Sequence, residues 1–380
     1  MTTTKNNEHK KLNVPNLRFP EFEGEWEEEL LADIADLYKG TGISKDQLSD
    51  EGEPCILYGE LYTKYKSETI REIISKTNID NTKLVRSKAN DVIIPCSGET
   101  AEDIATARCV LYDNVLLGGD LNVIRLHGYN GTFMSYQLNG KRKYDIAKVA
   151  QGVSVVHLYG EHLKGVKTIN PCLEEQKKIA KIFSLLDKRI ATQNKIIDGL
   201  QSLMRGIAQN VIRNNNPNVC LSECLECSSS TLQESEACEN GMFPVYGANG
   251  IVGYLDNYET ENEAIYIIKD GSGVGTVSYV TGKCSATGTL NTLQAKEGYS
   301  LQYLYYMLKV FNFETYKTGM AIPHIYFKDY GKAKVFCPTY TKQLQYARLL
   351  SAIDKRHTVE QRLLANLILQ KQYLLRQMFI

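Results

Sequence analysis

The sequence repeats part of itself at a distance of 167 residues. Adding 167 to the positions of seven residues in the segment that begins at Pro171 gives seven identical residues. These are Pro338, Gln343, Ala347, Ser351, Asp354, Lys355 and Arg356. The same offset also relates four pairs of identical residues that precede Pro171 and Pro338. They are Gly152 and Gly319, His157 and His324, Tyr159 and Tyr326, and Lys167 and Lys334. A repeat at one fixed offset predicts two copies of one structural unit.

Each copy ends in a proline-free stretch whose apolar residues keep a seven-residue repeat, the pattern of a coiled coil. The pattern is broken at Gln193 in the first stretch and at His357, Glu360 and Lys371 in the second. The predicted seam and docking positions are Ile179, Phe183, Leu186, Ile190, Ile197, Leu350, Ile353, Leu364 and Leu367. A helix of about 40 residues is about 60 Å long. We expect the two helices to pack on each other and to hold two domains apart; alternatively, each helix packs only on its own domain.

Length and composition fit this organisation. At about 100–200 residues per domain, the chain length corresponds to two or three domains. The apolar fraction of 43% and the charged fraction of 23% are ordinary for folded domains. Residues 1–13 are polar and no apolar run approaches the length of a membrane span, so we expect a cytoplasmic protein without a membrane partner. The ten cysteines are unevenly spaced, which favours reduced thiols over disulfides.

The charge balance does not by itself indicate a nucleic-acid partner. The formal net charge is zero, from 44 basic and 44 acidic residues. Basic residues gather at 64–88 and 141–148, and acidic residues at 21–29. Such runs are commonly solvated faces, so they do not predict DNA binding on their own.

Breaks in the pattern divide the chain into five predicted parts. These are an N-terminal arm at 1–29, a domain at 30–170, a helical region at 171–213, a second domain at 214–337 and a second helical region at 338–380. The polar run at 214–218 is the clearest boundary. Helical spacing predicts a helix at 30–38 that stops at 39–42. Strands are predicted at 92–94, 121–126, 264–268 and 276–280. Both domains are therefore expected to be mixed and mainly β.

Three motifs together resemble the specificity (S) subunit of Type I restriction-modification enzymes. They are Leu17-Arg18-Phe19-Pro20-Glu21-Phe22 followed by Trp26, the stretch from Phe243 to Tyr254, and the twice-used helix start with Pro, Gln and Asp-Lys-Arg. The resemblance covers nearly the whole chain. It implies an α+β fold with two target recognition domains, joined and separated by two long antiparallel coiled-coil helices. Each domain would read one half of a split sequence in double-stranded DNA.

The resemblance also implies partners and cofactors. The helices would dock two methyltransferase (M) subunits, and restriction (R) subunits would join for cleavage. S-adenosylmethionine would then belong to the M subunit, and ATP with Mg²⁺ to the R subunit. The second helix carries Thr341-Lys342-Gln343 where the first carries Glu174-Glu175-Gln176. The two docking sites are therefore expected to differ.

Motifs for catalysis are missing from the sequence. Asn170-Pro171-Cys172 is not the Asn-Pro-Pro-aromatic pocket of an adenine methyltransferase. No phosphate loop of the form Gly-x-x-x-x-Gly-Lys-Ser/Thr occurs. The glycine-rich run at 270–275 lies between two predicted strands, so it is expected to be a hairpin turn. We expect a non-catalytic subunit with no catalytic residues of its own.

A cysteine cluster leaves a zinc site as an alternative. Four thiols, Cys220, Cys224, Cys227 and Cys238, lie within 19 residues, and four thiolates can bind zinc. The first three are spaced as on the buried face of a short helix, which favours packing. We expect no metal.

The residues that contact DNA are predicted only as hypotheses. Polar and basic side chains in loops are the groups that read bases and hold phosphates. The candidates are Lys64, Ser97, Glu99, Arg108 and His157 in the first domain, and Asn249, Lys269, Ser272, Lys317 and His324 in the second. Two other functions stay open: an assembly scaffold whose domains bind only proteins, and a stand-alone zinc enzyme.

Overall fold

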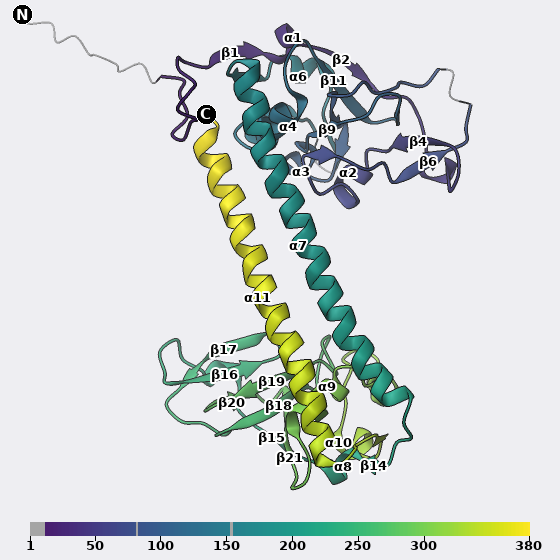
Figure 1. Ribbon diagram of the computed structural model, residues 1–380, viewed down its shortest axis with the longest axis vertical. Helices are drawn as coiled ribbons and strands as arrows, with labels where there is room; N and C mark the ends of the chain where they lie inside the picture. The colour runs from purple at the N-terminus through teal and green to yellow at the C-terminus, as the bar shows by residue number, and fades with distance from the viewer. Residues whose placement is uncertain (1–11, 81–82, 153–154) are drawn as a thin grey trace, which may run out of the picture. The chain divides into compact units, whose positions relative to one another are not determined.

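The structure, a computed structural model, describes residues 12–80, 83–152 and 155–380 (Figure 1). Most of the polar start predicted at 1–13 therefore lies outside the described residues. The chain forms two compact units. The first contains the described residues up to Thr192 together with Leu364–Ile380, and the second contains Gln193–Leu363.

The first unit combines mixed sheets with short helices. Its strands are β1 (Glu27–Leu30), β2 (Ala35–Lys39), β3 (Leu48–Ser49), β4 (Glu53–Ile56), β5 (Thr69–Ile70), β6 (Ser75–Thr77), β7 (Val92–Pro95), β8 (Ser97–Gly98), β9 (Arg108–Val110), β10 (Leu116–Leu117), β11 (Leu121–Leu126), β12 (Val156–His157) and β13 (Lys167–Asn170). Its short helices are α1 (Leu31–Ile34), α2 (Glu60–Thr63), α3 (Ala101–Ile104), α4 (Gly131–Asn139), α5 (Lys143–Val149) and α6 (Gly160–Lys164). The larger sheets have the orders β2-β11-β7-β9-β5 and β10-β4-β6-β3.

The apolar runs that predicted strands form the centre of this unit. Strand β11 pairs antiparallel with β2 on one side and with β7 on the other. Val123 and Ile93 face each other across the second pairing and are fully buried. Burying such a side chain contributes about 1.5–3 kcal/mol, so these strands are held by the core on both faces. The strands predicted at 92–94 and 121–126 are confirmed.

The helix predicted at 30–38 is wrong. Only one helical turn, α1, forms there, and the chain then continues as β2 up to Lys39. The stop expected at 39–42 is therefore the end of a strand. Ala35 and Leu37 pair with Leu126 and Ile124 of β11, and this pairing overrides the helical spacing of the apolar residues.

The second unit repeats the mixture of strands and short helices. Its strands are β14 (Val219–Cys220), β15 (Leu225–Ser229), β16 (Phe243–Gly247), β17 (Gly250–Leu255), β18 (Glu263–Ile268), β19 (Val277–Thr281), β20 (Ser285–Ala286), β21 (Leu290–Ala295) and β22 (Lys334–Val335). Its short helices are α8 (Leu221–Cys224), α9 (Leu301–Leu308) and α10 (Phe327–Tyr330). The sheet orders are β15-β21-β18-β19 and β17-β16-β20. The strands predicted at 264–268 and 276–280 are confirmed as β18 and β19.

The same scaffold recurs in both units. Strands β1 and β13 pair antiparallel in the first unit, as β14 and β22 do in the second. The one-turn helices α1 and α8 follow β1 and β14. Long helices α7 (Leu173–Arg213) and α11 (Tyr340–Met378) start directly after these paired strands. The predicted α+β class with a repeated two-domain organisation is confirmed.

A buried glutamine fixes the start of each long helix in the same way. The Gln176 side chain accepts a hydrogen bond from the Asn130 backbone N–H at 2.9 Å and donates one to the Pro171 carbonyl at 2.8 Å. Gln343 does the same with Ser300 and Pro338, at 2.9 and 2.8 Å. Asn130 and Ser300 are the N-caps of α4 and α9. Each glutamine therefore joins a domain helix to a long helix.

Replacing either glutamine with alanine should lower the free energy of unfolding. In Gln176→Ala or Gln343→Ala, one buried and one part-buried backbone group lose their partner, and a fully buried group left unpaired costs about 1–3 kcal/mol. Urea denaturation of each variant measures this loss. The exposed Gln372 of α11 provides the control, because its alanine variant should change stability by less than about 0.5 kcal/mol. If either glutamine variant were as stable as the control, the hydrogen bonds of that glutamine would not stabilise the fold.

Within each unit the two long helices run antiparallel (Figure 1). In the first unit the start of α7 meets the end of α11, where the Phe183 and Phe379 rings lie 5.8 Å apart. In the second unit Ala208 near the end of α7 shares a buried cluster with Leu350 near the start of α11. Of the predicted seam residues, Ile179, Phe183, Ile197, Leu350 and Leu367 are buried, and Leu186, Ile190, Ile353 and Leu364 are half-buried.

Two residues that break the apolar repeat pair with each other. Gln193 and Glu360 are buried, and the Gln193 amide donates to both the backbone carbonyl and the carboxylate of Glu360. Arg356 forms an ion pair with the same carboxylate. Gln193 and Glu360 are equivalent positions of the repeat. A polar pair at one seam position can fix helix register at some cost in stability, which explains why these breaks are tolerated.

The described part of the predicted N-terminal arm, residues 12–29, packs within the first unit. Trp26 is buried, and its ring lies 5.9 Å from that of Phe133. Arg18 forms two hydrogen bonds with the fully buried carboxylate of Glu175 in the first turn of α7, at 2.9 and 2.7 Å. Such bidentate pairs are strong and directional, so the arm is tied to the start of the long helix.

The cysteine cluster does not form the short helix that its spacing predicts. Cys220 ends β14, Cys224 ends the single turn α8, and Cys227 lies on strand β15. The strand pairings with β22 and β21 leave room for only one helical turn. The Cys224 sulfur lies 3.8 Å from that of Cys337, which lies outside the predicted cluster.

Candidate nucleic-acid interface

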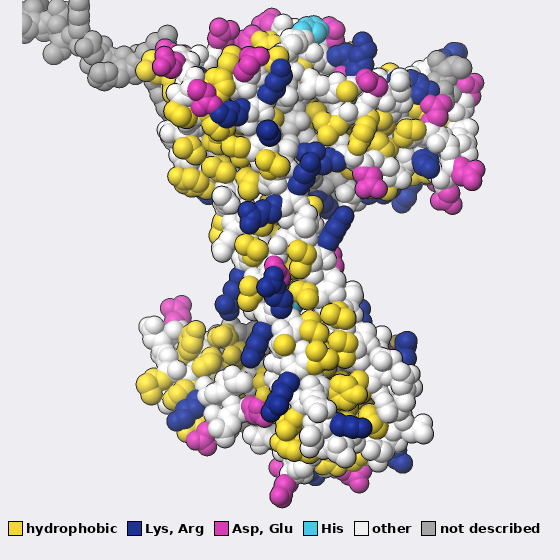
Figure 2. All heavy atoms as spheres, in the orientation of Figure 1, with side chains coloured by type: hydrophobic (Ala, Val, Ile, Leu, Met, Phe, Trp, Pro, Cys, Tyr) yellow, Lys and Arg dark blue, Asp and Glu magenta, His cyan; other side chains and the backbone are white. Residues whose placement is uncertain are grey.

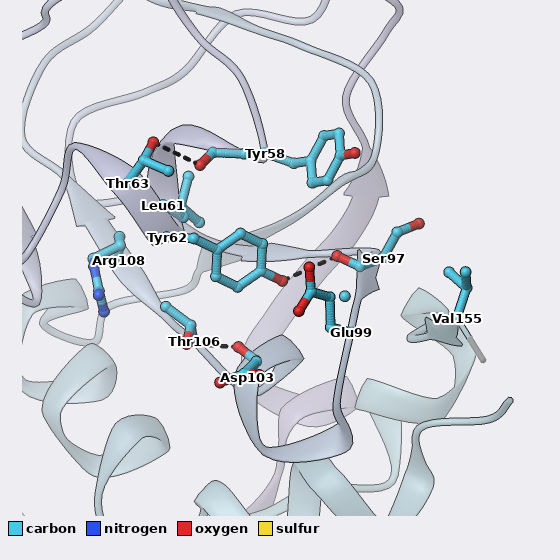
Figure 3. A pocket seen from close by; sticks show the side chains of 12 residues that line it. Tyr58, Leu61, Tyr62, Thr63, Ser97, Glu99, Asp103, Thr106, Arg108 and Val155 are labelled. Carbon is cyan, nitrogen blue, oxygen red and sulfur yellow. Dashed lines mark hydrogen bonds between the residues drawn. The ribbon is translucent and has the colours of Figure 1, made fainter. Parts of the chain in front are cut away.

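A cavity of about 690 Å³ opens on the first unit. Helix α2, strand β8, helix α3 and the start of β9 surround it (Figure 3). Its lining includes Tyr58, Tyr62, Ser97, Glu99, Asp103, Thr106, Arg108 and Val155. Aromatic rings, carboxylates, hydroxyls and one guanidinium therefore share one concave site.

Three of the predicted DNA-contact residues line this cavity. Figure 3 shows the Glu99 carboxylate beside the Tyr62 ring, with Ser97 on one side and Arg108 on the other. Glu99 is exposed and Ser97 is half-buried. The Tyr62 hydroxyl donates to the Ser97 carbonyl at 3.0 Å, and burial raises the pKa of that tyrosine. The ring is thereby held in place as one wall.

Arg108 is fixed by backbone contacts. Its guanidinium donates to the Tyr65 carbonyl at 3.1 Å and to the Ala107 carbonyl at 2.9 Å. Burial lowers the pKa of this guanidinium, and the carboxylates of Glu68 and Asp187 oppose that effect. Since an arginine stays charged even so, Arg108 contributes a positive charge to the cavity lining.

The other two candidates of the first domain lie outside the cavity lining. Lys64 donates to Glu60 at 2.7 Å and to Ser75 at 2.8 Å, so much of its charge is compensated within the unit. His157 lies on β12, and its Nδ1 atom is 3.4 Å from the Ser97 hydroxyl. His157 thus supports the rim through Ser97.

Sequence reasoning missed most of the cavity walls. Tyr58 lies just before the helical turn α2, and Tyr62 lies on it, four residues later. Asp103 is near the end of α3, and Thr106 follows that helix. The spacing of Tyr58 and Tyr62 was the available signal, because it places two aromatic rings on one helical face. For Asp103 a local signal also existed, because Thr100 caps α3 and bonds to Asp103, four residues after Glu99.

In the second unit three candidates lie around the turn between β18 and β19. Lys269 and exposed Ser272 are in this turn, and His324 contacts it, with Nδ1 2.7 Å from the Asp270 carboxylate. The predicted hairpin is confirmed, because β18 and β19 pair antiparallel. Asp270 was not among the predicted site residues.

The remaining candidates of the second domain lie elsewhere. Asn249 is exposed in the turn between β16 and β17. The Lys317 ammonium forms an ion pair with Glu314 at 2.6 Å. A second cavity of about 380 Å³ lies beside the β18–β19 turn and is lined by Lys309, Asn312 and Glu314 among others.

Basic and acidic side chains are mixed on the visible face of each unit, where Figure 2 shows Lys and Arg interspersed with Asp and Glu. Within the described residues, no group of three or more His, Cys, Asp or Glu side chains is placed to hold a metal ion. In the same part of the chain, every helix is too short or too polar to cross a membrane.

The two copies of the repeat both match one protein family. Residues 23–202 and 217–368 match the family described as the Type I restriction modification DNA specificity domain. This chain belongs to that family. The two matched ranges correspond to the two structural copies, so family membership rests on the whole repeat rather than on one motif.

Curated relatives in this family are distant. The EcoprrI specificity subunit of a Type I restriction enzyme from Escherichia coli is 26% identical over 116 residues, which are 30% of this chain and 29% of that relative. The MjaVIII specificity subunit from Methanocaldococcus jannaschii is 26% identical over 195 residues, 50% of this chain and 42% of that relative. The chain therefore spans less than half of the length of either relative in these matches.

Solved structures in the family share the fold more completely. The S subunit of a Type I restriction-modification system from M. genitalium has a TM-score of 0.71 at 18% identity, over 97% of this chain and 99% of that chain. A chain from a type I R-M system solved to explain complex assembly and conformational transition has a TM-score of 0.53 at 13% identity, over 93% of this chain and 97% of that chain. The family fold thus includes both copies and both long helices.

Proposed function

We propose that this chain is the DNA sequence-specificity subunit of a Type I restriction-modification complex. In this role each recognition domain reads one half of a split target in double-stranded DNA. Methyltransferase subunits dock on the subunit, and restriction subunits join them. The observation that carries the proposal is the family match over both copies of the repeat.

The cavity of the first unit has groups suited to base recognition. A carboxylate such as Glu99 accepts hydrogen bonds from the amino group of cytosine. A hydroxyl such as that of Ser97 can donate a hydrogen bond to a base or accept one from it. Arg108 adds a donor fixed by its backbone contacts. In the second unit Lys269, Ser272 and Asn249 lie in turns, where side chains can enter a groove. The divergent interiors of the two units suit two different half-sites.

The long helices would serve as the spacer. Two readers on one face of B-DNA need a separation that matches its helical turn, about 34–36 Å. In our proposal α7 and α11 set this separation, and the polar pair of Gln193 and Glu360 fixes their register. The number of unspecified bases between the two half-sites would then depend on the length of the helices.

The chain itself is proposed to be non-catalytic. Its sequence has neither the methyltransferase pocket motif nor a phosphate loop, so its residues do not fit S-adenosylmethionine or ATP. We assign S-adenosylmethionine to the methyltransferase subunit and ATP with Mg²⁺ to the restriction subunit. The contribution of this chain is to place the methyltransferase over a base chosen by sequence.

A gel-shift titration tests DNA binding. The complex with its methyltransferase subunit should bind duplex DNA, and log K should fall linearly with log salt at a slope of about 0.9 per phosphate contact. The methyltransferase subunit without this chain is the control. A flat salt response, or shifts equal to those of the control, would favour the scaffold whose domains bind only proteins.

A further inference from the structure

Two buried thiols face each other in the second unit. The Cys224 sulfur at the end of α8 lies 3.8 Å from the sulfur of Cys337, which comes three residues before the start of α11. These residues are 0% and 7% exposed. The sulfur atoms of a disulfide are about 2.05 Å apart, so the two atoms need to approach each other by only about 1.8 Å to bond.

Backbone contacts hold both cysteines in this position. The Asn218 side chain donates to the Cys337 carbonyl at 2.8 Å and accepts from the Cys337 N–H at 2.9 Å. The Lys296 N–H donates to the Cys224 carbonyl at 2.9 Å. Strands β14 and β22, which precede these cysteines, pair with each other. The fold therefore keeps the two thiols close without a covalent link.

A cavity of about 450 Å³ reaches one of the two thiols. Its lining includes Asn218, Tyr299, Cys337 and Gln343. Hydrogen peroxide is only slightly larger than water, which takes up about 30 Å³ in the liquid, so it fits into such a space. The cavity therefore gives a small oxidant access to Cys337, although this residue is buried.

The contact between the thiols also prepares one of them to react. Peroxides react with thiolates rather than with thiols. The Cys337 thiol lowers the pKa of Cys224, although burial opposes this effect. The same contact, together with burial, raises the pKa of Cys337. Cys224 therefore becomes a thiolate more readily, while a protonated thiol stays beside it.

The first copy of the repeat has different side chains at these positions. Asn170 is equivalent to Cys337 at the 167-residue offset, and Ile34 ends α1 as Cys224 ends α8. Asn170 is buried and donates to the Glu29 carboxylate at 3.0 Å. The shared scaffold therefore folds without thiols here, so the cysteine pair is a property of the second unit and not a requirement of the repeat.

From these observations we infer that Cys224 and Cys337 form a modification site, at which hydrogen peroxide converts the two thiols into a disulfide. One sulfur, as a thiolate, takes an oxygen atom from the peroxide and becomes a sulfenic acid, and the first water is released. The other thiol displaces the hydroxyl group of the sulfenic acid as a second water and forms the S–S bond. Two thiols and one peroxide thereby give one disulfide and two waters. This site does not depend on the proposed function.

Peptide mapping after peroxide treatment tests the inference. The reduced full chain is treated with hydrogen peroxide and digested, without a reductant, by trypsin and a glutamate-specific protease. Cleavage after Glu223 and Glu226 isolates Cys224 on the peptide 224–226. In most molecules this peptide should be joined to 335–342, with two hydrogen atoms fewer than the two separate peptides. A dithiol reductant should release both peptides unchanged, because disulfide formation is reversible by exchange.

Two variants and an unfolded sample serve as controls. Cys337→Ser should leave 224–226 without a joined peptide, whereas Cys238→Ser, which removes an exposed thiol outside the pair, should keep the joined peptides in full. Wild type oxidised in urea should give mixed pairings among its ten cysteines. The inference is wrong if the folded chain keeps both thiols at peroxide concentrations that oxidise exposed Cys172, or if Cys224 bonds mainly to another cysteine.

Thermal unfolding provides a second measurement. A bridge between residues 224 and 337 closes a long segment of the unfolded chain, and such bridges typically stabilise a fold. Oxidised wild type should therefore have a Tm about 5–10 °C above that of reduced wild type. The Tm of Cys337→Ser should not change with the same treatment. A lower Tm in the bridged chain would show that the sulfurs cannot bond in their native places, and would overturn the inference.

Discussion

Replacing Lys371 with methionine, the residue that the first helix carries at the equivalent position 204, should lower the free energy of unfolding by about 3–5 kcal/mol. The Lys371 ammonium lies 2.6 Å from the Glu68 carboxylate and 2.7 Å from that of Asp187, and its side chain is 16% exposed. Both carboxylates are largely buried. The variant would leave two buried carboxylates without their ion-pair partner.

Further hydrogen bonds surround this network, which ties α11 to the first domain. The hydroxyls of Tyr136 and Ser67 both donate to Asp187, at 2.5 and 2.7 Å. Burial lowers the pKa of Lys371, but the carboxylates of Glu68 and Asp187 outweigh this, so the pKa is raised above its ordinary value of 10.5. At pH values where both carboxylates are ionised, the stabilisation is therefore complete up to pH 10.5 and is lost as the pH rises through the raised value.

Urea denaturation at several pH values measures both effects. The difference between wild type and Lys371→Met should be large at pH 7 and shrink above pH 10.5. Adding Glu68→Gln and Asp187→Asn should restore most of the stability, because the uncompensated charges are removed. Lys164→Met, which breaks an exposed ion pair with Glu161, should cost only about 0–1 kcal/mol. Equal losses in the two lysine variants would contradict the network.

Exchanging residues 219–316 for the same segment of another specificity subunit should change one half of the target sequence completely and leave the other half and the gap unchanged. This segment contains the sheets of the second unit and the turn with Lys269 and Ser272. Its borders lie outside α7 and α11. Methylation sequencing of cells carrying the chimaera reads both half-sites at once.

The structure also indicates how such an exchange can fail. Helix α9 lies inside the segment, and its residues Tyr303 and Leu304 belong to the same buried cluster as Ala208 of α7 and Leu350 of α11. A donor with poorly matched side chains would leave cavities there. Exchanging only 219–295 keeps α9 in place and provides the control, which should alter the same half-site with a smaller loss of stability. A change in both half-sites would refute the separation of the two readers.

The sequence predicted those parts of the fold that local patterns determine. The run at 121–126 forms β11, with its first four residues buried, and the glycine-rich run at 270–275 is a hairpin turn. The prediction at 30–38 failed because pairing of Leu37 with β11 decided the structure, and that partner lies far away in sequence. Likewise, the long-range contact of Cys224 with Cys337 could not be read from the spacing of the cluster.

The candidate site was predictable only in part, for the same reason. Ser97, Glu99 and Arg108 were predicted as polar or basic side chains in loops; Ser97 and Arg108 lie on strands β8 and β9, and the fold brings all three to one cavity. Lys64 looked equally suitable, but its partner Glu60 lies one helical turn away and compensates its charge. In the sequence, Lys371 and Gln193 interrupt the apolar repeat of the coiled coil. The buried groups that they bind lie on other elements, so the reason for these interruptions is visible only in the structure.

We propose that this chain makes a methyltransferase act on a DNA sequence read in two halves. The most direct measurement is methylation sequencing of genomic DNA from cells that express the methyltransferase subunit with and without this chain. We predict that, only when the chain is present, modified adenines appear in one split sequence, two specified groups separated by a fixed number of unspecified bases. Modification at an unbroken sequence, or the same pattern in both strains, would contradict the account.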